Sequence, residues 1–134
     1  MIENIEIIKD GELTTIELNA LLKTNNWEIF PDKKINKMLE NSWCYLTARD
    51  QQKNLIGFVH TLSDDILHAY ILRLIVHPDF RNYGIGTLLM QTLMDILKEN
   101  NLKPTLVATL GNKKFYERFG FKTEIKGLTA MCVR

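Results

Sequence analysis

Residues 73–89 of the chain read Arg-Leu-Ile-Val-His-Pro-Asp-Phe-Arg-Asn-Tyr-Gly-Ile-Gly-Thr-Leu-Leu. An apolar run ends at Pro78, a short basic turn follows, and Gly84 and Gly86 open an amphipathic helix. The pattern predicts a strand that feeds a tight loop, whose backbone amides and helix N-terminus can hold a phosphate group. Glycine lets the main chain approach such a group without a side chain in the way, and Arg81 adds a positive charge. The stretch therefore predicts a site for a phosphorylated cofactor.

The spacing of the glycines argues against two common phosphate-binding loops. A dinucleotide-binding loop requires Gly-x-Gly-x-x-Gly, but Leu89 stands three places after Gly86. A nucleotide-hydrolysing phosphate loop ends in Gly-Lys-Ser/Thr, whereas here Thr87 follows Gly86 directly and no lysine is present. The loop must therefore serve another kind of phosphorylated cofactor.

Two blocks of sequence resemble one known family. Residues 81–86, Arg-Asn-Tyr-Gly-Ile-Gly, resemble the pyrophosphate-binding motif of the GNAT superfamily of acetyl-CoA-dependent N-acetyltransferases. Residues 115–121, Phe-Tyr-Glu-Arg-Phe-Gly-Phe, resemble its later motif, in which a helix ends in Gly-Phe and carries a Tyr near the thioester. The blocks occur in the expected order, and the resemblance covers residues 55–121 well and 1–54 only in general layout. It implies one N-acetyltransferase domain over residues 1–134, with acetyl-CoA (coenzyme A) as cofactor.

The same resemblance implies an α/β (α+β) fold with a mixed, mostly antiparallel central sheet of six to seven strands, splayed between the fourth and fifth. Hydrophobic periodicity and turn residues agree, because they predict the order β-α-α-β-β-β-α-β-α-β-β, which suits a mixed sheet with helices on both faces. The predicted strands are a first one with Ile2, Ile5, Ile7 and Ile8, then residues 43–48, 55–62, 67–76, 105–108, 121–125 and 128–133. The predicted helices are residues 12–24, a short one that starts at Pro31–Asp32 and ends near Asn41–Ser42, and residues 84–99 and 111–119.

Composition describes an ordinary globular domain. The chain is 46% hydrophobic and 25% charged with a formal net charge of +1, which gives no support for a nucleic-acid or membrane partner. No apolar run approaches the ~20 residues of a membrane span, and the N-terminus has no cationic lead-in of a secretory signal. We therefore expect a cytoplasmic protein. Cys44 and Cys132 lack CxxC spacing, so we expect buried, reduced thiols rather than a disulfide.

The resemblance also assigns cofactor contacts. The amides of residues 82–87 would hold the pyrophosphate, the strand end at residues 74–76 would pair with the pantetheine arm, and an N–H of Ile75 or Val76 would polarise the acetyl carbonyl. Many relatives place an Asn seven positions before the motif Tyr; here that position is Thr109. Lys113 and Lys114 either reach the 3′-phosphate or are simply solvated. The expected cofactor-binding residues are Leu74, Ile75, Val76, Arg81, Asn82, Tyr83, Gly84, Ile85, Gly86, Thr87, Thr109 and Asn112.

Tyr116 is the candidate catalytic residue. A phenol has an intrinsic pKa of ~10, above that of a thiol, so it can protonate the coenzyme A thiolate at neutral pH. The alternative is that Tyr116 packs on the sheet beside Phe115. The base is unassigned, because the two strand positions where relatives carry Glu or His hold Tyr70 and Leu72. Asp64, Asp65, His68 and Glu28, a water relay or an already neutral amine remain as candidates.

The acceptor amine is expected near an aromatic loop. Trp27, Phe30 and Tyr70, with Ile29 and Trp43, could line a pocket at the mouth of the sheet, which favours an apolar or aromatic amine; the alternative is that the loop packs on the first helices. Strict alternation puts Arg73 on the strand face opposite Tyr70, where it pairs with an acidic side chain or binds a ligand carboxylate. The pair is the default expectation. His60 and His77 show no metal-ligand arrangement, and we expect no metal.

These observations favour an N-acetyltransferase that moves an acetyl group from acetyl-CoA to a primary amine of a small molecule. Transfer is expected to be direct, because neither Cys44 nor Cys132 lies in a motif with a partnered base. Acetylation of a protein N-terminus or lysine stays open, as does a noncatalytic acyl-CoA-binding module. A homodimer is compatible with the resemblance, since dimers are common among such domains.

Overall fold

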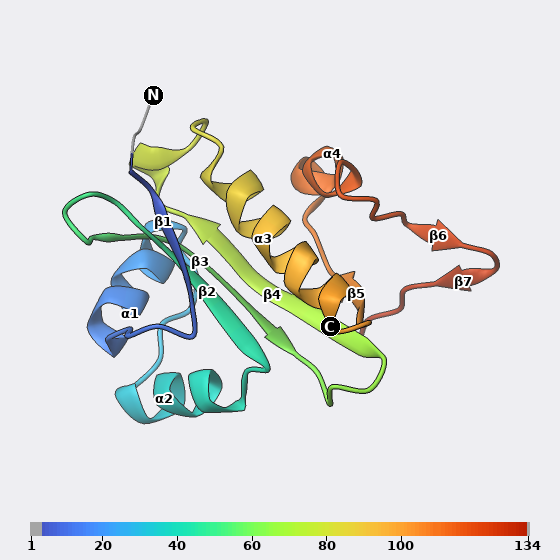
Figure 1. Ribbon diagram of the computed structural model, residues 1–134, viewed down its shortest axis with the longest axis horizontal. Coiled ribbons are helices and arrows are strands. Elements are labelled where there is room, and N and C mark those ends of the chain that lie inside the picture. The colour runs from blue at the N-terminus through green and yellow to red at the C-terminus, as the bar shows by residue number, and fades with distance from the viewer. Residues whose placement is uncertain (1–3, 134) are drawn as a thin grey trace.

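A five-stranded sheet forms the centre of the computed structural model, which describes residues 4–133 (Figure 1). The first four strands pair antiparallel, and the fifth lies parallel to the fourth. The sheet is therefore mixed and mostly antiparallel, as predicted. In spatial order its strands are β1 (Glu6–Lys9), β2 (Cys44–Arg49), β3 (Leu55–Leu62), β4 (His68–Val76) and β5 (Lys103–Leu106).

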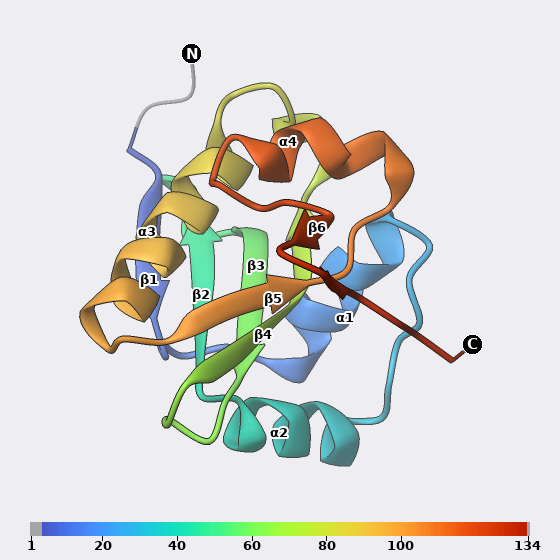
Figure 2. The same ribbon diagram turned by 90° about the vertical axis from the view of Figure 1, so that its right-hand side faces the viewer.

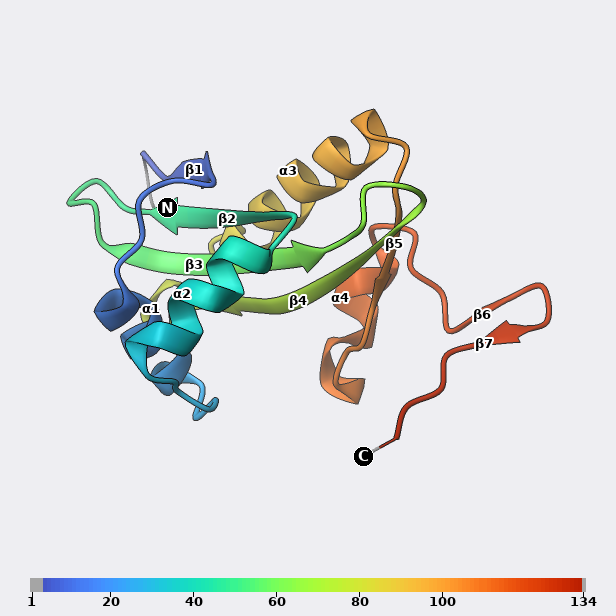
Figure 3. The ribbon, with the colours of Figure 1, turned by 90° about the horizontal axis from the view of Figure 1, so that it is seen from below.

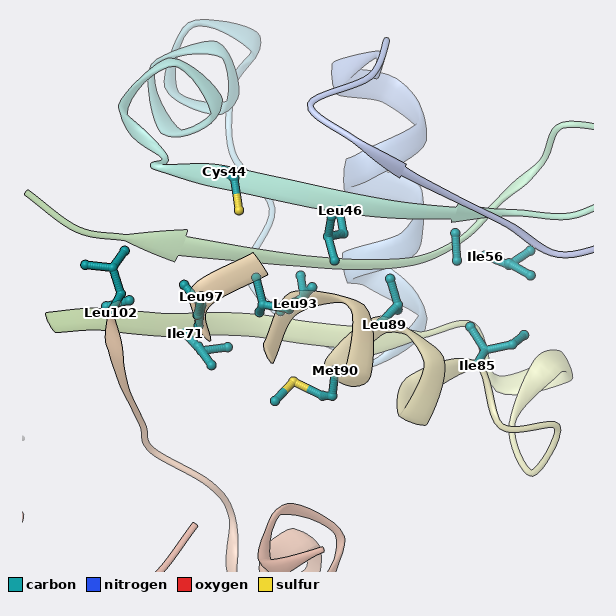
Figure 4. Packing of buried hydrophobic residues seen from close by; sticks show 13 residues of the cluster. Cys44, Leu46, Ile56, Ile71, Ile85, Leu89, Met90, Leu93, Leu97 and Leu102 are labelled. Atoms are coloured by element: carbon teal, nitrogen blue, oxygen red, sulfur yellow. The ribbon is translucent and has the colours of Figure 1, made fainter. Parts of the chain in front are cut away.

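Helices cover both faces of this sheet (Figures 2 and 3). On one face lie α1 (Thr15–Thr24) and α2 (Asp32–Asn41), and on the other lies α3 (Ile85–Glu99). The α3 face holds the larger apolar cluster, in which Leu89, Met90 and Leu93 are fully buried and Leu89 and Leu93 point toward the strands (Figure 4). A second cluster, on the face that α1 and α2 cover, joins these two helices to Phe58 and Ile75 of the sheet. The resulting three-layer arrangement confirms the expected fold class.

The sheet opens between β4 and β5. The two strands pair only over His68–Ile71 and Lys103–Leu106, so residues 72–76 of β4 have no strand partner on that side within residues 4–133. This confirms the predicted splay. It leaves main-chain groups at the end of β4 free, directly before the 3₁₀ turn η1 (Pro78–Phe80) and the start of α3.

The C-terminal part differs from the expected pattern. The strand expected after Pro104 instead contains it, because β5 is the edge strand of this sheet and an edge can spare one N–H. The helix expected over 111–119 is a 3₁₀ turn, η2 (Leu110–Asn112), followed by the short helix α4 (Lys113–Glu117). The larger difference concerns the last two strands, β6 (Glu124–Ile125) and β7 (Leu128–Thr129), which do not join the central sheet and pair only with each other.

The central sheet therefore has five strands rather than six or seven. The β6–β7 hairpin projects from the domain (Figures 1 and 3). Its strands have two residues each, and Ile125 and Leu128 stay exposed, so no apolar face holds the hairpin against the edge of β5. Cys132 follows this hairpin and is exposed, against expectation, whereas Cys44 is buried beside Thr61 as expected.

Ile2, expected in the first strand, lies outside the described residues. Within residues 4–133, no helix is both long and apolar enough to cross a lipid bilayer.

Candidate active site

A cavity of about 650 Å³ lies where the free end of β4 meets the start of α3 and α4. It brings together most of the residues expected to bind the cofactor: Leu74, Ile75, Val76, Arg81, Asn82, Gly84, Ile85, Gly86, Thr87 and Asn112, together with Tyr116. Four further residues on its wall were not foreseen: Asn25, Phe80, Phe115 and Arg118. Segments far apart in the sequence thus form one site.

The N-terminus of α3 supplies free backbone amides to this cavity. Gly84 caps the helix with φ 82° and ψ 12°, and Asn82 before it also has a positive φ of 68°. Across the described chain, the amides of residues 82–87 donate to no other protein group, and Leu88 is the first to bond back, to the Gly84 carbonyl at 2.9 Å. The first turn of α3 carries no acidic residue. Free amides and the positive end of the helix dipole together favour an anion here.

Two arginines add positive charge to the same wall. Arg81 donates to the Val76 carbonyl at 3.4 Å and to the side chain of Asn25. Arg118 donates to Thr87 Oγ1 at 2.6 Å, and its guanidinium lies 5.1 Å from the centre of the Phe115 ring. None of the wall residues is acidic. The cavity is therefore suited to a ligand with several negative charges.

Arg118 was missed although it lies inside the second motif. From the sequence alone, a basic residue at the end of a short helix is expected to be exposed to solvent. Only the packing of α4 beside α3 brings Arg118 to Thr87. That packing is close: a Cβ added to Gly86 would stand 3.5 Å from the Phe115 ring. Thr87 and Arg118 also line a second hollow of about 350 Å³ between α3 and α4.

Tyr116 faces this cavity from α4. Its ring packs edge-on against Phe115, with centroids 5.0 Å apart, and lies 6.2 Å from Phe121. Burial raises the pKa of the Tyr116 phenol above its ordinary value, so the hydroxyl is protonated at neutral pH. Within the described residues the hydroxyl has no hydrogen-bond partner, which leaves its proton available to a ligand. Packing and proton donation are thus compatible at this residue.

The amides at the end of β4 complete the geometry. The His77 amide donates to the Ile56 carbonyl, and the register pairs Val76 with Gly57 and Ile75 with Phe58. Antiparallel pairs alternate between bonded and non-bonded, so the Ile75 N–H points to β3 and the N–H groups of Leu74 and Val76 point to the opening. Of the two expected amides, the register favours Val76 and disfavours Ile75.

Comparison with known proteins agrees with this geometry. A model described as the acetyltransferase (GNAT) family matches residues 13–121. The chain belongs to the GNAT family. An uncharacterised N-acetyltransferase, ycf52 of Gracilaria tenuistipitata var. liui, is 29% identical over 136 residues, covering 97% of this chain and 74% of that protein. The histone acetyltransferase TAP1 of Glycine max is 27% identical over 141 residues, covering 97% and 61% of the two chains.

Solved structures share the fold. The probable acetyltransferase SA2161 of meticillin-resistant Staphylococcus aureus superposes with a TM-score of 0.84 at 20% identity, over 98% of this chain and 99% of that one. The Escherichia coli GNAT family N-acetyltransferase YhbS, solved in complex with CoA, gives a TM-score of 0.71 at 21% identity, over 89% and 69% of the chains. The chain is thus a GNAT acyltransferase, and the cofactor of this family is acetyl-CoA. Its free amides, two arginines and open strand edge fit that cofactor.

Two expected cofactor contacts of this GNAT domain lie off the wall of the cavity. Tyr83 is 52% exposed and is not among the residues that line the cavity. Thr109 is exposed, and its hydroxyl accepts a hydrogen bond from Asn112 Nδ2 at 3.0 Å. Thr109 thus contacts Asn112, which does line the cavity. Lys113 and Lys114 are exposed and are also absent from the wall.

The expected acceptor and base residues are not gathered at the cavity either. Trp27, Phe30 and Tyr70 do not line it, and Trp43 donates its indole N–H to Asp65 in the β3–β4 turn, at the far end of β4. The remaining base candidates, Asp64, His68 and Glu28, are exposed and outside the cavity. Among the described wall residues there is no carboxylate and no imidazole, so the base stays unassigned.

A β-bulge changes the expected position of Arg73. Arg73 and Leu74 together oppose Val59, and Arg73 has a positive φ of 53°. Strict alternation therefore fails, and Arg73 lies on the same face as Tyr70, beside Phe30 and His60. The expected acidic partner is wrong too: the guanidinium bonds to His60, and no carboxylate of residues 4–133 pairs with it.

Proposed function

We propose that this GNAT enzyme transfers the acetyl group of acetyl-CoA directly to a primary amine of a small molecule, with Tyr116 as general acid. One observation supports the proposal: the residues with free amides at 82 and 84–87, two arginines, the open edge of β4 and Tyr116 all line one cavity. Acetyl-CoA, when bound, supplies the acetyl thioester. Each of these groups then has a distinct task.

The amides of residues 82–87, with Arg81 and Arg118, hold the pyrophosphate through charge-assisted hydrogen bonds. The N–H of Val76 or Leu74 donates to the acetyl carbonyl oxygen, where negative charge develops as the amine attacks. The C–S bond breaks as the C–N bond forms, and Tyr116 gives its proton to the departing sulfur. The attacking nitrogen loses one proton to solvent, so an acceptor that is already neutral serves best.

The experiment that tests this proposal measures coenzyme A release with a thiol reagent for a panel of amines. We expect Tyr116→Phe to lower kcat by about 10²–10⁴-fold, the range of a general acid, because the departing sulfur no longer receives a proton. The dissociation constant of acetyl-CoA is expected to stay within about twofold, since the ring remains. Unchanged turnover in this variant would remove the acid role.

The panel also separates the alternatives. Peptides with a free N-terminus or a lysine test protein acetylation, which the name of the Glycine max relative brings into consideration. Acetyl-CoA binding without turnover of any amine or peptide would indicate a noncatalytic acyl-CoA-binding module. A homodimer and a cytoplasmic location stay predictions of the sequence; light scattering on the purified chain tests the first.

A further inference from the structure

Arg73 carries a positive charge that the protein does not neutralise. The guanidinium lies half-buried in the middle of β4, 5.9 Å from the centre of the Phe30 ring, and its Nη1 lies 3.0 Å from His60 Nε2. No acidic side chain of residues 4–133 forms an ion pair with it. A buried charge ordinarily requires a partner of opposite sign, and residues 4–133 supply none to this half-buried guanidinium.

The hydrogen bonds of His60 show that this side chain accepts from Arg73 but does not neutralise its positive charge. The Ser42 hydroxyl donates to the Met38 carbonyl at 2.7 Å, so Ser42 Oγ must accept from His60 Nδ1, 2.9 Å away. Because the ring carries its proton on Nδ1, Nε2 is unprotonated, and its lone pair accepts a hydrogen bond from Arg73. Burial, and then the charge of Arg73, lower the pKa of His60 to about 4, so the ring is neutral at pH 7. These hydrogen bonds orient Arg73 and leave its full charge in place.

Arg73 is next to the reaction site. Leu74 follows it directly and lines the cofactor cavity, while the bulge sends the Arg73 side chain to the α1–α2 face. Cross-strand pairing with Leu62 and His60 puts Tyr70 and Leu72 on that same face. The loop between α1 and α2 is also fixed, because the Asn19 amide bonds both the N–H and the C=O of Phe30, at 3.1 and 2.7 Å. The cation thus lies in a defined position across β4 from the cavity that Leu74 lines.

We propose that Arg73 binds a carboxylate of the acceptor, so that the acceptor is an amine that also carries a carboxylate. The inference rests on the proposed transferase function and names its substrate class. A guanidinium has five N–H donors, and His60 uses one, which leaves enough for a two-bond contact with a planar carboxylate. One positive charge balances one carboxylate, whereas a phosphate dianion would need a second cation.

The test compares each amino acid with the amine that lacks its carboxylate: alanine with ethylamine, phenylalanine with phenethylamine, and lysine with cadaverine. With wild-type protein we expect kcat/KM to be about tenfold or more higher for the acid, because a hydrogen bond to a charged group is worth that factor or more. Arg73→Gln is expected to bring the ratio near one, through a higher KM for the acids, and Arg73→Lys to keep part of it. The matched control Lys98→Gln removes an exposed cation from the end of α3 and keeps the wild-type ratio.

Binding measurements make the test independent of turnover. Calorimetry with coenzyme A present compares N-acetylphenylalanine with N-acetylphenethylamine, and acetyl-CoA affinity checks that each variant is folded. A protein that turns over no amine yet binds the acid selectively, in a manner lost in Arg73→Gln, would refute the transferase and support the carboxylate site. Equal or better use of the uncharged amines by wild type would overturn the proposal, as would a preference for phosphoethanolamine over every amino acid.

Discussion

Gly84 shows how one residue can serve the ligand rather than the core. Its φ of 82° is a conformation that L side chains rarely adopt, and a Cβ added there would meet no protein atom within 4 Å. A side chain at this position, which lies on the cavity wall, would therefore stand in open space rather than against the protein. The glycine is needed for backbone shape and for access, not to relieve a clash inside the protein.

Replacing Gly84 by valine tests both needs at once. We expect Gly84→Val to lower the free energy of unfolding by roughly 1–2 kcal/mol through the left-handed conformation, and to weaken acetyl-CoA binding by more than about 100-fold, or roughly 3 kcal/mol. Gly111→Val is the matched control, because Gly111 also has no atom within 4 Å but no positive φ. Chemical denaturation and calorimetry measure the two effects. Full affinity in Gly84→Val would contradict the phosphate-loop assignment.

At the scale of elements, α1 holds the Phe30 loop, beside Arg73, in place. Thr14 and Glu17 form a capping box at its N-terminus, and Arg49 of β2 reaches the same Glu17 carboxylate with two bonds of 2.7 and 3.0 Å. The side-chain hydrogen bond from Arg49 is the main cause that lowers the pKa of Glu17. Because α1 also carries Asn19, which fixes the Phe30 loop, the cap that stabilises α1 also helps to hold this loop in position.

Glu17 should therefore make stability depend on pH in acid. A carboxyl whose pKa is lower in the folded state contributes stability above its unfolded pKa and loses that contribution as the pH falls through the folded pKa. We expect Glu17→Gln to be about 1–2 kcal/mol less stable than wild type at pH 7, and the difference to shrink below about pH 4. Glu40→Gln, an exposed residue of α2, is the control. A difference that persists undiminished at pH 3 would contradict this account.

Elements governed by local pattern were predictable, and those governed by tertiary pairing were not. Strand β3 occupies residues 55–62 as expected, since its apolar run is bounded by a polar turn on one side. The bulge at Arg73 has no such local signal, because strict alternation and a bulge fit the same apolar run; only the pairing with Val59 reveals it. The free amides at the start of α3 were predictable because one short stretch of sequence, with Gly84 and Gly86, provides them. Arg118 and Asn25 reach the cavity only through packing.

For the whole molecule, the cavity lies where three separate parts of the chain meet. The edge of β4, the N-terminus of α3 and α4 each contribute wall residues, and α4 is a five-residue helix with no buried residue of its own. A ligand in the cavity therefore contacts the sheet edge on one side and, on the other, a short helix whose residues are all at least partly exposed. Binding should tie these parts together and stabilise the native state as a whole.

Acetyl-CoA should consequently raise the melting temperature. A ligand at 100 times its dissociation constant adds about 2.7 kcal/mol, which corresponds to roughly 10 °C for a chain of this size. NAD and ATP should give smaller shifts, because they carry phosphates but lack the pantetheine arm that can pair with the open edge of β4. Amide hydrogen exchange locates the effect: peptides that span residues 72–88 and 109–119 should slow on binding, while the projecting β6–β7 hairpin should exchange as before. Equal shifts with all three ligands, or protection confined to the hairpin, would show that the open edge of β4 takes no part in binding.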